Sequence, residues 1–233
     1  MTAGMLRALE EKAAPGHTAL LIVDVQNDFC SDDGAFARLG RDLSRIQNML
    51  TALERLLAAA REAGVTVIFL RYAQTPVTES PVHLEQRSRG RSDIAYCQEG
   101  TPGADFYRIG PQPGEIVVTK HRYSGFIGTD LDLILRSRGI RTLVMTGVAT
   151  NGCVEATARD GFMHDYYIVF TSDGAACYSA ELHNATLTNI LDAYGVVASC
   201  DEMAALWASG SAATPARAAA ANAVSEPDLA VES

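Results

Sequence analysis

The sequence predicts an α/β fold, a three-layer αβα sandwich around a six-stranded, mostly parallel sheet. Short runs rich in β-branched residues recur along the chain, and segments with helical periodicity lie between them. The strand-like runs are apolar throughout instead of alternating with polar residues, which indicates strands that are covered on both faces.

The predicted strands are short, and most of them are bounded by Gly, Pro, Asn or Asp, which are residues typical of turns. They cover residues 18–25, 65–72, 115–119, 141–147, 166–172 and 194–199.

The clearest predicted helix covers residues 42–63, in which large apolar residues recur every three or four positions. These residues are Leu43, Ile46, Leu50, Leu53, Leu56 and Leu57. Shorter helices are predicted at 129–138, 153–164, 179–192 and 201–208, with a further short one within 1–14. Residues 1–208 are therefore expected to form a single domain, and the Ala-, Ser- and Pro-rich segment 209–233 is expected to be a flexible tail.

Composition excludes several classes of function. The net charge of −9 disfavours a nucleic-acid partner. The chain has no apolar run of about 18 residues and no visible secretory signal, so no membrane contact is expected. The 5 cysteines are scattered without C-x-x-C pairs, and no two histidines stand four residues apart, so we expect reduced thiols in the cytoplasm and neither a metal nor a cofactor.

Three reactive side chains stand at or just after the ends of predicted strands, where the active sites of open parallel sheets form. Cys153 follows a strand and a tight turn, and Thr150 or Asn151 can cap the helix that begins there. Free N–H groups in a first helical turn favour a thiolate and can stabilise an oxyanion. The alternative is a small apolar core residue.

The other two side chains are Asp24, which closes the first strand, and Lys120, which follows the third. Asp24 is a candidate general base for the thiol of Cys153, although a helix cap or turn residue is an equal alternative. Lys120, if it faces Asp24, would hold the carboxylate in place and favour the thiolate; a solvated surface lysine is the alternative.

Three blocks of sequence, in order and with compatible spacing, resemble the isochorismatase-like cysteine hydrolase family. They are TALLIVDVQNDF, EIVVTKHRYSGFIGTDLDLILRSRGI and TLVMTGVATNGCVEATARDGF, and the similarity extends over roughly residues 18–200. The resemblance implies that Asp24, Lys120 and Cys153 are the catalytic residues. It also implies a six-stranded parallel sheet and a homodimer or homotetramer.

The resemblance further assigns the surroundings of the nucleophile. It implies a cis peptide between Val148 and Ala149, and an oxyanion hole made by the N–H groups of Ala149 and Cys153. Substrate-binding positions are implied at three residues near the catalytic ones, namely Phe29, Tyr123 and Asn151.

Within the family, the sequence is most similar to ureidoacrylate amidohydrolases, with biuret hydrolases and N-carbamoylsarcosine amidohydrolases as neighbours. It departs from the ureidoacrylate pattern at His121 and Gly152. The expected function is hydrolysis of the C–N bond of a small ureido or carbamoyl compound through a Cys thioester, releasing ammonia or carbamate. The alternatives are a carboxamide hydrolase of the maleamate type and a non-catalytic, redox-sensing relative. Arg122 would bind a substrate carboxylate or form a structural ion pair, with the second favoured.

Overall fold

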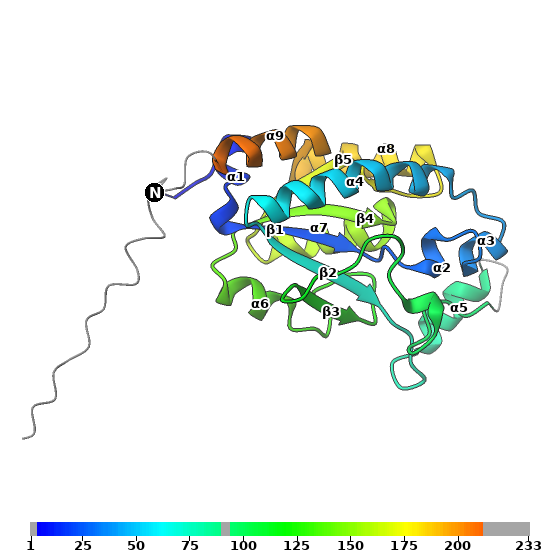
Figure 1. The fold of residues 1–233 in the computed structure, drawn as a ribbon. Helices are drawn as coiled ribbons and strands as arrows, with labels where there is room; N and C mark the ends of the chain where they lie inside the picture. Colours follow the sequence, from blue (N-terminus) through cyan, green and yellow to red (C-terminus); the bar gives the residue numbers. More distant parts are fainter. Residues whose placement is uncertain (1–3, 90–93, 212–233) are drawn as a thin grey trace, which may run out of the picture.

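The computed structural model describes residues 4–89 and 94–211, and its centre is one parallel β-sheet (Figure 1). The strands of this part of the chain are β1 (Thr18–Val23), β2 (Thr66–Tyr72), β3 (Ile116–Lys120), β4 (Thr142–Val148), β5 (Tyr167–Ala176) and β6 (Gly195–Ala198). Their order in the sheet is β3-β2-β1-β4-β5-β6, and every neighbouring pair is parallel. The predicted α/β sandwich with a six-stranded sheet is therefore confirmed.

Both faces of the sheet are covered by helices, as the continuous apolar runs predicted. On one face, α4 (Ser44–Glu62) and α9 (Cys200–Ser211) pack on Leu20 and Ile22 of β1. On the other face, α6 (Leu131–Ser137) and α7 (Glu155–Met163) pack on Leu21 of β1, and α8 (Ala180–Asn189) adds Leu187 to the same cluster. Figure 1 shows α4 and α9 on one side of the sheet and α6 on the other.

The strand order reverses between β1 and β4, since the chain winds outward from this pair in both directions. Side chains placed after β1 and β4 therefore lie beside the crevice where ligands bind in open α/β sheets. The two strands approach closely at Gly147, whose φ is +105°. A β-carbon there would lie 2.1 Å from the carbonyl oxygen of Val23, so only glycine fits.

Three short helices were not predicted from the sequence: α2 (Asn27–Cys30), α3 (Ala35–Arg38) and α5 (Pro81–Arg89). They are too short or too polar to show a helical pattern, and they all lie near the carboxyl ends of the strands (Figure 1).

The ends of the described chain are tied together. The short helix predicted within 1–14 is α1 (Leu9–Lys12), and the indole Nε1–H of Trp207 in α9 donates to the carbonyl of Ala13, 2.9 Å away. α9 continues to Ser211, past the predicted domain boundary at residue 208. The rest of the predicted tail, 212–233, lies outside the described residues. No helix of the described chain is long and apolar enough to cross a bilayer.

Candidate active site

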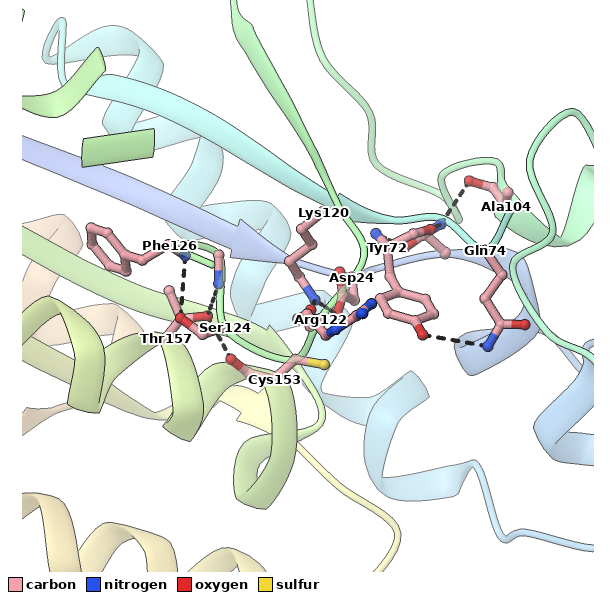
Figure 2. A network of polar contacts seen from close by, with 12 residues as sticks. Asp24, Tyr72, Gln74, Ala104, Lys120, Arg122, Ser124, Phe126, Cys153 and Thr157 are labelled. Carbon is pink, nitrogen blue, oxygen red and sulfur yellow. Dashed lines mark hydrogen bonds and ion pairs between the residues drawn. The ribbon is translucent and has the colours of Figure 1, made fainter. Parts of the chain in front are cut away.

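The ends of three strands bring Asp24, Lys120 and Cys153 together, as their positions in the sequence predicted. Asp24 directly follows β1, Lys120 is the last residue of β3, and Cys153 lies in a π-helical turn, η3 (Thr150–Val154), after β4. Figure 2 shows the three side chains converging on one region.

Asp24 and Lys120 form a fully buried ion pair. The Lys120 Nζ lies 2.7 Å from Oδ2 of Asp24, and neither side chain is exposed to solvent. Because β2 separates β3 from β1, the lysine side chain must reach across the end of β2, and its Nζ lies 5.1 Å from the ring centroid of Tyr72 there. Lys120 also donates to the backbone carbonyl of Arg122 at 3.1 Å, which fixes its position further.

Burial and charge act against each other on this pair. Burial raises the pKa of Asp24 above its ordinary value, although the positive charge of Lys120 opposes the shift. Burial disfavours the charged form of Lys120 too, but the negative charge of Asp24, joined by that of Cys153 whenever the sulfur is ionised, outweighs it, and the pKa of Lys120 is raised. The lysine therefore stays protonated, while the aspartate is prepared to accept a proton.

The surroundings of Cys153 disfavour the thiolate. Burial raises its pKa far above the ordinary value, and the nearby positive charge of Lys120 only partly offsets this. The sequence had suggested a thiolate at the start of a helix. Cys153 does lie in the helical turn η3 that leads directly into α7, but burial there raises the pKa of the thiol. Its proton must consequently be removed by a base. Oδ1 of Asp24 is buried without a hydrogen-bond partner among the described residues, and it is available for this role.

The turn that carries Cys153 begins at a cis peptide between Val148 and Ala149, where the family resemblance places one. The carbonyl of Ala149 accepts hydrogen bonds from the N–H groups of Gly152 at 2.9 Å and Val154 at 3.3 Å, which closes the turn. Ala149 and Cys153, the two residues expected to form the oxyanion hole, stand at either end of this short segment and both line the same cavity.

That cavity has a volume of about 300 Å³ and opens beside Cys153. The predicted substrate-binding residues Phe29, Tyr123 and Asn151 all line it. Sequence reasoning missed several other wall residues, namely Phe36, Tyr72, Gln86, Tyr96 and Tyr178. Of these, only Tyr72 carried a usable signal, because it ends β2 beside the strand ends that supply Asp24 and Lys120.

The aromatic walls of the cavity hold one another in place. Phe36 and Tyr178 stack with ring centroids 5.1 Å apart, and Tyr72 and Tyr96 stack at 5.8 Å. The hydroxyl of Tyr178 donates to the carbonyl of Phe29 at 3.1 Å, so it is not free to rotate toward a ligand. The result is a mostly apolar, aromatic wall beside Cys153.

Arg122 takes neither of the two roles considered from the sequence. Its Nη1 donates to two backbone carbonyls, those of Thr78 at 3.0 Å and His121 at 2.7 Å. It is absent from the cavity lining, and no ion pair of Arg122 is found in the described structure. The guanidinium thus joins the loop after β3 to the loop after β2, and the favoured ion pair was wrong.

Comparison with known proteins identifies the family. The isochorismatase domain model matches residues 18–202. A ureidoacrylate amidohydrolase RutB of Pseudomonas syringae pv. syringae is 39% identical over 202 residues, which cover 81% of this chain and 82% of the relative. The RutB of an Enterobacter species is 37% identical over 198 residues, covering 79% and 86% of the two chains.

Solved structures of similar fold include other hydrolases of this kind. A cysteine hydrolase from Pseudomonas syringae pv. phaseolicola is similar with a TM-score of 0.76 and 27% identity, covering 90% of this chain and 100% of that one. An N-carbamoylsarcosine amidase from Thermoplasma acidophilum is similar with a TM-score of 0.64 and 28% identity, covering 79% and 97%. The prediction from the sequence motifs is confirmed: the chain belongs to the isochorismatase family of hydrolases.

Proposed function

We propose that the protein hydrolyses the C–N bond of a small ureido or carbamoyl compound through a thioester on Cys153. The observation that carries this proposal is the buried Asp24–Lys120 pair beside Cys153, a residue that lines a cavity. A carboxylate that can accept a proton, next to a thiol that must lose one, is the pairing that activates a cysteine nucleophile. The names of the relatives, ureidoacrylate amidohydrolase and N-carbamoylsarcosine amidase, support the substrate class.

In the first half-reaction, Asp24 takes the proton of the Cys153 thiol, and the sulfur attacks the carbonyl carbon of the substrate. The negative charge that develops on the carbonyl oxygen is held by the N–H groups of Ala149 and Cys153. The protonated Asp24 then gives its proton to the nitrogen as the C–N bond breaks. The products are the free amine and the thioester.

In the second half-reaction, Asp24 removes a proton from a water molecule, which attacks the thioester carbonyl. The carbon–sulfur bond breaks, the acid or carbamate leaves, and Asp24 returns the proton to the Cys153 sulfur. Lys120 stays charged throughout and limits the cost of carrying negative charge on buried Asp24 or on the sulfur. Phe29, Tyr123 and Asn151 would contact the bound substrate.

The proposal extends to the state of the protein in the cell. Four of the cysteines are buried and none forms a disulfide, which is typical of a reducing compartment and supports a cytoplasmic location. The family resemblance supports a homodimer or homotetramer. We also propose that residues 1–208 form a single hydrolase domain, and the last turn of α9 continues past that boundary to Ser211.

The test is ammonia release by the wild-type protein, Cys153→Ala and Cys153→Ser on ureidoacrylate, biuret, N-carbamoylsarcosine and maleamate. Cys200→Ala is the matched control, because it removes a buried thiol on the α4 side of the sheet. We expect both Cys153 variants to lose activity and the control to keep it. Wild-type turnover by Cys153→Ala would overturn the mechanism, and activity confined to maleamate would move the substrate class to carboxamides. Reversible oxidation of Cys153 without ammonia release from any of the four compounds would favour a redox sensor.

A further inference from the structure

Gly152 stands immediately before the nucleophile and forms part of the wall of the cavity. Its backbone angles, φ −124° and ψ −109°, are not helical and interrupt the turn that carries Cys153. The φ angle is negative, so the left-handed conformation that usually demands glycine is not the reason for this residue.

Packing does not demand a glycine here either. A β-carbon on Gly152 would meet only the β-carbon of Ala149, at 3.9 Å, which is an ordinary van der Waals contact. At Gly125 and Gly161, in contrast, a β-carbon would come within 2.6 Å and 2.9 Å of leucine side chains. The missing side chain at position 152 therefore leaves open space at a residue that lines the cavity and directly precedes Cys153 in the chain.

The walls around this space indicate what could occupy it. Among the described residues that line the cavity, six are aromatic, and none has a carboxylate, an ammonium or a guanidinium. The aromatic residues are Phe29, Phe36, Tyr72, Tyr96, Tyr123 and Tyr178. A flat apolar group gains most from such walls, because it can stack on rings and it loses no hydration of charge.

We propose that Gly152 is a specificity-determining position, which admits substrates carrying a flat, ring-sized apolar group close to the reacting carbonyl. The chemistry of the reaction rests on the proposed function, but the steric claim does not. A substrate of this class is larger and less polar than a bare ureido acid. A side chain at position 152 would close the space to the ring and leave it open to small amides.

Alkylation of Cys153 tests the steric claim without requiring turnover. Iodoacetamide and N-benzyliodoacetamide both form a thioether with the sulfur and release iodide and a proton, and they differ only in a benzyl group. The alkylation rate with each reagent is followed by intact-protein mass spectrometry in the wild type, Gly152→Ala, Gly152→Val and Gly110→Ala. The last is the matched control, because a β-carbon on Gly110 would also have one neighbour, the β-carbon of Phe106 at 3.8 Å, and Gly110 does not line the cavity. Cys153→Ala gives the background from the buried thiols.

The expected result is a change in the ratio of the two rates. Gly152→Val should lower the rate for the benzyl reagent relative to iodoacetamide by about tenfold or more, which is the usual effect of hydrocarbon that does not fit a pocket. Gly152→Ala should lower it less, and Gly110→Ala should leave it unchanged. A strained backbone at position 152 would slow both reagents alike, so an unchanged ratio in Gly152→Val overturns the proposal.

Turnover separates this inference from the proposed function. N-Carbamoylglycine and N-carbamoylphenylalanine differ by the same benzyl group, and the wild type should prefer the second in kcat/KM while Gly152→Val prefers the first. The alkylation ratio could change as expected while no ammonia is released from these two compounds or from ureidoacrylate, biuret, N-carbamoylsarcosine and maleamate. In that case the proposed function fails and the steric inference stands. Ammonia release without a preference of the wild type for N-carbamoylphenylalanine would mean that the proposed function stands and the steric inference fails.

Discussion

The ammonium of Lys120 lies 2.7 Å from a carboxylate oxygen of Asp24, and both side chains are completely buried. Neither charge has access to solvent, so each depends on the other for its stabilisation.

Replacing Lys120 with Met should destabilise the protein by about 3–5 kcal/mol, the usual cost of leaving one buried charge without its partner. The measurement is the free energy of unfolding from urea titration near neutral pH. Lys12→Met is the control, since Lys12 is a partly exposed lysine whose Nζ donates to the carbonyl of Arg7. Equal losses in the two variants would show that the buried pair has no special role.

The acid limb of the pH profile should report the protonation of Asp24. Catalysis needs this carboxylate without its proton, so kcat/KM should rise with pH as the proton is lost. Because burial raises the pKa of Asp24, the midpoint of this acid limb should lie above pH 3.8, the ordinary pKa of an aspartate. In Lys120→Met it should move to still higher pH, because the positive charge that lowers the pKa of Asp24 is gone. A limb that stays in place or moves to lower pH in this variant would contradict the role of Asp24 as the base.

Asp28 should position the aromatic wall although it lies outside the cavity lining. Its buried carboxylate accepts hydrogen bonds from the backbone N–H groups of Ala35 at 2.9 Å and Cys97 at 2.6 Å. Phe36 and Tyr96 are the chain neighbours of these two residues, and their rings contact each other at 5.4 Å. Asp28→Ala should therefore raise KM by about tenfold with a smaller change in kcat, since the loss of a buried acceptor costs about 1–3 kcal/mol.

Steady-state kinetics check the prediction for Asp28. Asp28→Asn keeps one carbonyl acceptor and should show a smaller rise in KM than Asp28→Ala, whereas Asp33→Ala alters an exposed carboxylate nearby and should change nothing. A fall in kcat with KM unchanged would assign Asp28 to the chemical step instead.

His183 should make stability depend on pH. Its Nδ1 lies 2.9 Å from the hydroxyl of Thr150, the first residue of η3, and its Nε2 lies 3.1 Å from the carbonyl of Ser172. Burial lowers the pKa of His183 below 6.5 in the folded state. The stability that the neutral ring provides is present above 6.5 and is lost as the pH falls through the folded-state pKa, because the unfolded chain binds the proton more readily.

The urea concentration at the unfolding midpoint of the wild type should thus decrease as the pH is lowered from about 7 to about 5. The midpoint of His183→Gln should decrease less over the same pH range. His164→Gln replaces a half-exposed histidine and should retain the slope of the wild type. Identical slopes in the wild type and His183→Gln would assign the loss to other groups.

The sequence allowed the sheet and the convergence of Asp24, Lys120 and Cys153 to be predicted, because strand ends in a parallel sheet meet at one edge. It did not allow the walls of the cavity to be predicted. Phe36 and Tyr96 come from a short helix and a loop without periodicity, and their positions depend on tertiary contacts such as those of Asp28. The raised pKa of Cys153 was also out of reach, because desolvation depends on how the final packing surrounds the sulfur.

The absence of a side chain at position 147 has a consequence for screens of random variants. Asp24 and Cys153 follow β1 and β4, and these strands pass so closely that a β-carbon on Gly147 would lie 2.1 Å from the carbonyl oxygen of Val23. A substitution there would force the strands apart and separate the base from its thiol. A selection for activity would accordingly rank Gly147 as highly as the nucleophile, although Gly147 does not line the cavity. A mutational map of this enzyme would then mark a packing position as if it took part in the reaction.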